Sequence, residues 1–246
     1  AEVASVIDSL QQTGRQPACF IAETFPSVGG QLVPPPHYLQ QVYAHVRGAG
    51  GVCIADEVQT GLGRLGHYFW GFEQQQVTPD IVVLGKPLGN GYPLAAVVTT
   101  ADIAASFDTG MEFFATFGGA SVACAAGHEV LRIIDDEQLA ARSATVGDHL
   151  LAGLRQLATH YPMLADVRGC GLFIGVEIAD ADRQPLAAQT DYIVNRLRDR
   201  RVLIGSDGPH HNVLKIRPPL TFSVEDTDYL LMHLEAVLSE NALREY

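Results

Sequence analysis

Short apolar runs and helical patterns alternate along the first half of the chain. The apolar runs have the length of strands, and they lie at residues 18–22, 51–55, 80–84 and 95–99. Between the first two runs, Leu39, Val42 and Val46 recur at helical spacing and predict a helix over residues 37–48, and a further helix is expected over residues 1–14. Because the runs contain no alternating polar positions, they predict strands that are buried on both faces. Such strands, alternating with helices, indicate an α/β fold with a mostly parallel sheet.

The second half of the chain predicts a smaller α+β arrangement. Helices are expected over residues 120–160 and 187–200, one strand with two interrupting glycines over residues 166–178, and paired strands over residues 202–204 and 213–216. A last helix is expected from Ser223, with Asp226 completing a capping box. We therefore expect part of a large domain over residues 1–160 and a small C-terminal domain over residues 161–246.

Composition and charge exclude several classes of protein. The 246 residues carry a formal net charge of −12 and their 16 basic residues are scattered, so a nucleic-acid partner is not expected. No apolar run reaches the roughly 18 residues that a membrane span needs, and the first residues lack the pattern of a signal peptide. The four cysteines are far apart and the nine histidines have no ligand spacing. We therefore expect a cytoplasmic protein with reduced cysteines, no metal and no membrane partner.

Two charged residues stand at the ends of apolar runs. Asp56 directly follows the run at residues 51–55, and Lys86 follows the run at residues 80–84 after a single glycine. Parallel sheets bind their ligands at the carboxyl ends of strands, so both residues are candidates for a ligand site. The two residues alone equally allow a structural ion pair, because a charge that leaves water needs a partner.

The sequence around Lys86 favours a cofactor site. Glycines at positions 85, 89 and 91 allow a flat, bulky ligand to approach the backbone. A lysine in apolar surroundings is more readily neutral, and a neutral amine can attack an aldehyde. Pyridoxal phosphate (PLP) needs such a lysine, together with an acid that keeps its pyridine nitrogen protonated. Asp56 is the candidate for that acid.

Four segments of the chain resemble the class III aminotransferases, a PLP-dependent family. The segment Ala55–Gly66 is similar to the family's cofactor motif, and Pro79–Pro93 is similar to its lysine motif; Ala115–Gly119 and Val213–Leu220 match two further family segments in order and spacing. The resemblance covers nearly the whole chain. It implies the PLP-dependent transferase fold of type I, with part of the large-domain sheet and a smaller C-terminal α+β domain.

The resemblance also implies a role for individual residues. Lys86 would bind the cofactor covalently and later move a substrate proton, and Asp56 would pair with the pyridine nitrogen. The other cofactor-binding residues would be Val58 on a face of the ring, Gln59 at the phenolic oxygen with Glu23 nearby, and Thr116 at the cofactor phosphate of a neighbouring subunit in a homodimer. Thr116 as a plain loop hydroxyl and Glu23 as a solvated strand end remain open alternatives, and the role of Arg64 is open.

A substituted position points to one branch of the family. Where most of these aminotransferases carry a carboxylate-binding arginine, this chain has Lys215, and Arg217 stands two residues further on. Lysine suits a phosphate as a point charge, whereas arginine suits a carboxylate. Together with further similar segments, Lys215 resembles the ethanolamine-phosphate phospho-lyases. The expected substrate is a small phosphorylated amine that loses phosphate by β-elimination, and the alternative activity is amine or ω-amino acid transamination.

The resemblance also implies a phosphate-binding loop that this chain does not contain before Glu23. The family's large domain includes a phosphate-binding loop rich in glycine and serine, which is not found before Glu23. The chain therefore resembles the C-terminal part of such an enzyme, with a missing N-terminal segment as a partner. Alone, it is expected to be inactive and to bind PLP weakly. An inactive fragment that only associates with other chains is the non-enzyme alternative.

Two other enzyme classes fit the motifs less well. Gly61–Gly66 matches GxGxxG, but the preceding strand already ends in Asp56-Glu57, which disagrees with the tight turn of an NAD-binding fold. The apolar strand before Asp56 also resembles the acidic strand of nucleotide hydrolases. That class needs a lysine followed by serine or threonine in its phosphate loop, and here Pro87 follows Lys86.

Overall fold

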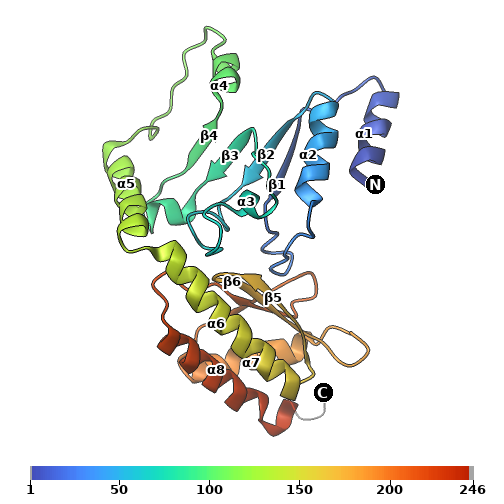
Figure 1. Cartoon of the computed structure of the whole chain (residues 1–246), viewed down its shortest axis with the longest axis vertical. Helices are drawn as coiled ribbons and strands as arrows, with labels where there is room; N and C mark the ends of the chain where they lie inside the picture. The colour runs from blue at the N-terminus through green and yellow to red at the C-terminus, as the bar shows by residue number, and fades with distance from the viewer. Residues whose placement is uncertain (1, 244–246) are drawn as a thin grey trace. The chain divides into compact units, whose positions relative to one another are not determined.

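The computed structural model describes residues 2–243, which form two compact units (Figure 1). The first unit combines Ala1–Thr24, Pro34–Leu62 and Trp70–Glu137, and the second combines Phe25–Val33, Gly63–Phe69 and Gln138–Tyr246. Two short loop segments from the first half of the chain therefore belong to the second unit. The last change of unit along the chain falls between residues 137 and 138. The domain boundary expected between residues 160 and 161 stays a prediction.

The first unit contains a four-stranded, mostly parallel sheet, as predicted. Its strands are β1 (Cys19–Glu23), β2 (Val52–Asp56), β3 (Ile81–Leu84) and β4 (Ala96–Thr99), in that order across the sheet. β1, β2 and β3 are parallel, whereas β4 runs antiparallel to β3. The crossovers include α2 (Tyr38–Gly48) and α3 (Gly71–Gln74), and the unit also holds α1 (Glu2–Gln12), η1 (Lys86–Gly89), α4 (Ala101–Phe107) and α5 (Ser121–Asp136).

Helix α2 covers one face of this sheet. Leu39, Val42 and Val46 pack with Cys53 of β2, and Phe20 of β1 lies against the same cluster. The opposite face includes Ile21 and Val97, which are 60% and 67% exposed. The prediction that the strands are buried on both faces is therefore wrong for residues 2–243, and even on the face of α2 the residue Val98 of β4 is 54% exposed.

The second unit is built on an antiparallel sheet in the order β5-β6-β8-β7. Its strands are β5 (Leu164–Cys170), β6 (Phe173–Ile178), β7 (Gly205–Asp207) and β8 (Val213–Ile216), and its helices are α6 (Leu139–His160), α7 (Ala187–Asp199), α8 (Val224–Leu238) and η2 (Asn241–Leu243). The strand expected over residues 166–178 is two strands, because Gly171 adopts a left-handed φ of 53° and turns the chain. The strand expected at residues 202–204 is displaced to residues 205–207, which pair with β8.

A large apolar cluster forms the main core of the second unit. Leu150 and Leu154 of α6, Ile174 of β6, Leu214 of β8 and Leu234 of α8 are fully buried in it. The predicted capping box is confirmed: Ser223 accepts a hydrogen bond from the Asp226 amide, and the Asp226 carboxylate accepts one from the Ser223 amide. No helix formed by residues 2–243 is long and apolar enough to cross a membrane.

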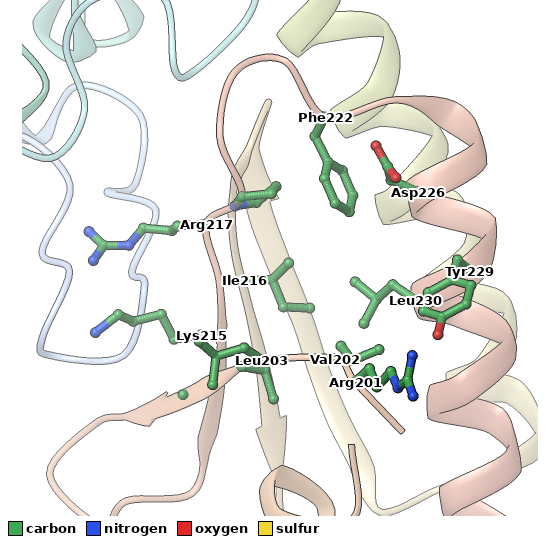
Figure 2. A pocket seen from close by; sticks show the side chains of 13 residues that line it. Arg201, Val202, Leu203, Lys215, Ile216, Arg217, Phe222, Asp226, Tyr229 and Leu230 are labelled. Atoms are coloured by element: carbon green, nitrogen blue, oxygen red, sulfur yellow. The ribbon is translucent and has the colours of Figure 1, made fainter. Parts of the chain in front are cut away.

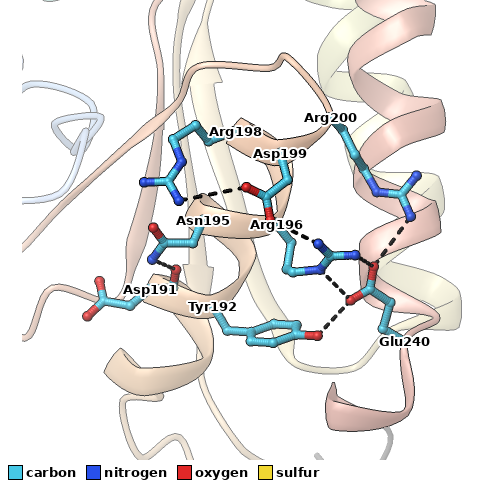
Figure 3. A network of polar contacts seen from close by, with 8 residues as sticks. All are labelled: Asp191, Tyr192, Asn195, Arg196, Arg198, Asp199, Arg200 and Glu240. Carbon is cyan, nitrogen blue, oxygen red and sulfur yellow. Dashed lines mark hydrogen bonds and ion pairs between the residues drawn. The ribbon is translucent and has the colours of Figure 1, made fainter.

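A carboxylate at the end of α8 ties that end to α7 (Figure 3). Glu240 accepts hydrogen bonds from Tyr192 at 2.6 Å, from Arg196 at 2.9 Å with each of its two oxygens, and from Arg200 at 3.3 Å. The hydrogen bonds from Arg196 and then from Tyr192 lower the pKa of Glu240 to about 2. The ionised form of Glu240 therefore stabilises the second unit.

We expect Glu240→Gln to lower stability near neutral pH and to lose that effect in acid. A carboxylate with a lowered pKa contributes stability above its ordinary pKa of 4.5, and this contribution disappears as the pH falls towards about 2. Thermal unfolding midpoints of wild type and variant, measured at decreasing pH, should therefore converge below the ordinary pKa. Glu235→Gln on the same helix is the control, and an equal effect of both variants at every pH contradicts this account.

Candidate active site

The register of the parallel strands brings the predicted cofactor residues to one edge of the first unit. Glu23 pairs with Asp56, and Asp56 pairs with Val83. The amide of Glu57 then donates to the Val83 carbonyl at 3.0 Å, which continues the ladder by one residue. Lys86 follows Val83 by three residues and begins η1. The carboxyl ends of β1, β2 and β3 thus carry Glu23, Asp56 and Lys86.

The carboxylate of Asp56 is held in place from one side. Its Oδ1 accepts a hydrogen bond from the Val58 amide at 2.9 Å, and the residue is half-buried. Its Oδ2 has no hydrogen-bond donor among residues 2–243. A protonated pyridine nitrogen is a donor that fits this oxygen, and a charge-assisted hydrogen bond of this kind is strong.

The loop after β2 lies against the backbone that precedes Lys86. A Cβ atom placed on Gly85 would lie 3.5 Å from Cγ2 of Val58, so these two residues are neighbours. Lys86 itself is exposed and has a φ of 37°, a left-handed conformation that is uncommon for residues other than glycine and clusters at functional sites. Residues 2–243 include no ion pair between Asp56 and Lys86, so the structural alternative for these two is not what the chain forms.

The surroundings of Lys86 differ from the expectation in one respect. The sequence predicts an apolar environment for this amine, but among the described residues the side chain faces solvent. The glycine-rich segment after it forms η1, against which α5 packs. The neighbouring residues therefore fix the backbone of Lys86, and they do not enclose its amine.

The remaining predicted cofactor residues lie in two places. Gln59 and Glu23 are half-buried and belong to the strand-end region, next to Val58 and Asp56 respectively. Thr116 lies in the exposed loop between α4 and α5, close in sequence to Phe114 and to Phe117, which is 87% exposed. The specific contacts predicted for these three residues stay predictions.

Glu57 is a functional candidate that the sequence analysis did not single out. It follows Asp56 directly, is 1% exposed, and accepts four hydrogen bonds. Burial raises the pKa of Glu57 above its ordinary value, and the hydrogen bonds oppose this shift. The available signal was strand alternation: successive side chains point to opposite faces, so Glu57 must point away from Asp56 and into the protein.

Lys215 is already part of an ion pair in the second unit. Its Nζ lies 2.8 Å and 3.0 Å from the two carboxylate oxygens of Asp207, whose side chain is almost buried. Asp207 also accepts a hydrogen bond from the side-chain Nε2 of Gln31 at 2.8 Å. The positive charge of Lys215 is therefore balanced within the chain, and its predicted contact with substrate stays a prediction.

A cavity of about 660 Å³ lies beside β8 in the same unit (Figure 2). Ile216, Phe222 and Leu230 converge on it, whereas Lys215 and Arg217 extend to the other side of β8, as strand alternation requires (Figure 2). The interior of the cavity is therefore mainly apolar. The ammonium group of Lys215 does not point into it.

The glycines of the GxGxxG segment serve packing. A Cβ atom on Gly63 would lie 2.8 Å from Cβ of Ala140, and one on Gly66 would lie 2.5 Å from Cα of Ala144. Both alanines belong to α6, so these glycines allow the loop to lie directly on that helix. This contact explains the glycine spacing without a nucleotide.

Arg64 proves to be a structural clamp. Its guanidinium donates to the carbonyl of Leu172 at 3.1 Å and to that of Pro218 at 2.8 Å, while its own carbonyl accepts from Ser143 at 2.7 Å. Burial, and to a lesser extent the nearby charge of Arg217, lowers the pKa of Arg64 to about 10. Arg64 therefore joins three parts of the second unit.

We expect Arg64→Gln to lower the free energy of unfolding by about 1–3 kcal/mol, because it leaves buried carbonyl groups at positions 172 and 218 without donors. Urea denaturation of wild type and variant measures the loss.

The matched control is Arg142→Gln. Arg142 is exposed and also donates to two backbone carbonyls, those of Thr221 and Phe222. Water can replace its hydrogen bonds, so the control should cost clearly less. Equal losses for the two variants would contradict the clamp.

Comparison with known proteins places this site in a family. Residues 1–238 match the family Aminotransferase class-III. The chain is 46% identical over 230 residues to alanine–glyoxylate aminotransferase 2-like of Drosophila melanogaster, covering 92% of this chain and 47% of that protein. It is 38% identical over 246 residues to ethanolamine-phosphate phospho-lyase homolog 1 of Caenorhabditis elegans, covering 97% and 52%. A phospholyase from Arthrobacter, solved in complex with phosphoethanolamine, matches with a TM-score of 0.94 and 42% identity, covering 97% of this chain and 57% of that one.

The chain belongs to the class III aminotransferases, a family of PLP-dependent enzymes. It spans about half the length of the curated relatives it matches. The predicted family, its PLP-dependent fold of type I and its cofactor are thereby confirmed. The names of the relatives include both aminotransferases and phospho-lyases, so they leave the individual activity open.

Proposed function

We propose that this chain carries the covalent cofactor site of a PLP-dependent enzyme that removes phosphate from a small phosphorylated amine such as O-phosphoethanolamine. The proposal is supported by the register that sets Asp56 beside Val83, three residues before Lys86, and by the position of Val58 next to Gly85. The similarity to a phospholyase in complex with phosphoethanolamine supports the choice of substrate.

The chain contains only two lysines, Lys86 and Lys215. Lys215 is paired with Asp207, whereas Lys86 forms no ion pair among the described residues. A covalent bond to an aldehyde requires a neutral amine. Lys86 is therefore the lysine that we assign to the cofactor.

Each residue at the strand ends has a separate task in this proposal. Bound PLP supplies an electron sink for the charge left when a substrate carbon loses its proton. Lys86 would hold the cofactor until the substrate amine displaces it, and its freed Nζ would then take the proton from the carbon next to nitrogen. Asp56 would keep the ring nitrogen protonated, Val58 would contact a ring face, and Gln59 and Glu23 would serve the phenolic oxygen.

The proposed reaction is a β-elimination followed by hydrolysis. Phosphate leaves from the second carbon with the electrons of the C–O bond, and water then releases an aldehyde and ammonia. From O-phosphoethanolamine and one water, the products are acetaldehyde, ammonia and inorganic phosphate. Lys215, as a lysine where the family pattern has arginine, is consistent with a substrate that has a phosphate and no carboxylate.

Transamination is the second candidate activity. It begins with the same proton transfer to Lys86 and differs in where a proton is returned. The 46% identity to a protein named as an alanine–glyoxylate aminotransferase favours it. An inactive fragment is the third possibility that an assay has to distinguish.

We also propose that further polypeptide completes the site. The apolar side chains of Ile21 and Val97 on the sheet, and of Phe113, Phe114 and Phe117 in the loop with Thr116, are exposed over most of their surface. Exposed apolar patches of this kind mark interaction sites. A second copy of the chain at the Thr116 loop and another segment of the enzyme on the sheet are the partners we propose.

The substrate proposal predicts that the protein containing this chain releases inorganic phosphate from O-phosphoethanolamine when PLP is present. Phosphate and acetaldehyde should appear in equal amounts, and Lys86→Ala should abolish both. Amino transfer to pyruvate or glyoxylate without phosphate release contradicts the phospho-lyase and supports the transaminase. Neither product, with PLP bound, supports the inactive fragment.

The cofactor proposal predicts that, in the protein that contains this chain, borohydride reduction after incubation with PLP attaches a pyridoxyl group to Lys86. Peptide mapping by mass spectrometry can assign the adduct to one residue of the chain, because Lys215 is its only other lysine. Lys215→Arg should leave the adduct unchanged. Labelling of Lys215 or of neither lysine at stoichiometric PLP overturns the assignment.

A further inference from the structure

Glu57 binds four donors with a single buried carboxylate. Its Oε1 accepts from the hydroxyl of Thr24 at 2.6 Å and from the amide of Phe72 at 3.0 Å. Its Oε2 accepts from the hydroxyl of Thr60 at 2.6 Å and from the amide of Gly71 at 2.8 Å. One side chain thus connects the end of β1, the loop after β2 and the start of α3.

The four donors suit an ionised carboxylate. Backbone amides can only donate, so a proton on either oxygen of Glu57 would compete with the amide of Gly71 or Phe72 for that oxygen. Gly71 allows this close approach, because a Cβ atom there would lie 3.0 Å from Cβ of Thr24 and from Oγ1 of Thr60. The site is therefore built around a carboxylate at position 57.

The backbone of Glu57 is fixed as firmly as its side chain. Its amide donates to Val83 of β3 at 3.0 Å, and its carbonyl accepts from the amide of Gly61 at 2.9 Å. Its two chain neighbours are Asp56 and Val58, which the proposed function assigns to the cofactor ring. Because adjacent side chains of extended backbone point in opposite directions, holding Glu57 inward directs Asp56 outward.

We infer that Glu57 is a positioning residue: it anchors the loop after β2 from inside so that Asp56 presents its free carboxylate oxygen to the pyridine nitrogen of the cofactor. This inference rests on the proposed cofactor site. It assigns Glu57 no contact with the cofactor or substrate. Its effect is transmitted through the hydrogen bond between Val58 and Asp56.

The test is a double-mutant cycle on PLP affinity in the protein that contains this chain. Glu57→Gln keeps the shape of the side chain but replaces one carboxylate oxygen by an NH₂ group. This group is a donor, and it would face the hydroxyl and the backbone amide that donate to that oxygen in wild type. We expect it to weaken PLP binding about tenfold or more, since a buried hydrogen-bond network is broken. In an Asp56→Asn background, where the ring nitrogen has lost its acid, the same change should weaken binding less than about threefold.

A purely structural role for Glu57 predicts a different result. The fold-change in PLP affinity would then be the same with Asp56 and with Asn at that position, and this additivity overturns the inference. Thr60→Val is the milder second variant if Glu57→Gln does not fold, because it removes one of the four donors; it should show the same dependence on Asp56. Glu73→Gln is the matched control: Glu73 accepts from the Trp70 amide at the start of α3 and should not depend on Asp56.

Failure of the inference and failure of the proposed function give different outcomes. If wild type takes up PLP on Lys86 and the cycle is additive, the inference alone is wrong. If wild type forms no adduct on Lys86, the cofactor site is wrong and the inference fails with it. The free energy of unfolding without PLP is measured for each variant. Glu57→Gln should lower it by the same amount whether position 56 holds Asp or Asn. A coupling that appears only in PLP affinity supports the positioning role.

Discussion

The parallel register of β1, β2 and β3 is the constraint on which the rest of this site depends. It sets Glu23 beside Asp56 and Asp56 beside Val83. The segment that leads from β3 to Lys86 therefore starts next to the last residue of β2, Asp56. A shift of one residue in β2 would turn Asp56 inward and Glu57 outward. The site therefore depends more on the fixed register of these strands than on any single contact.

The side chain at position 57 anchors the segment that follows β2. Two consecutive carboxylates differ in their hydrogen bonds. Asp56 has one oxygen without a donor among the described residues, whereas both oxygens of Glu57 accept hydrogen bonds from donors in three segments. In the second unit Arg64 does comparable work with carbonyl groups, and Lys215 is balanced by Asp207. Of the two lysines of the chain, Lys215 is committed to an ion pair, and Lys86 is the amine that remains available among the described residues.

Sequence predicted the local parts of this arrangement well. Apolar runs followed by Asp56 and Lys86 indicated the strand ends, and the Ser223–Asp226 capping box indicated the start of α8. The hairpin at Gly171 was missed because one glycine conformation decides it. Arg64 could not be assigned, since its partners lie far along the chain: Leu172 and Pro218 are 108 and 154 residues away. For Glu57, strand alternation gives the inward direction of the side chain but not the donors that it meets. The specific contacts of Thr116 and Lys215 with ligands rest on family resemblance alone.

The central claim is that Asp56 holds the ring nitrogen of PLP in its protonated form while Lys86 binds the aldehyde. Nitrogen-15 NMR of the protein loaded with PLP labelled at the ring nitrogen measures this directly. The account predicts the chemical shift of a protonated pyridine in wild type, and that of a neutral pyridine in Asp56→Asn with Lys86 still modified. The same shift in both proteins would contradict it.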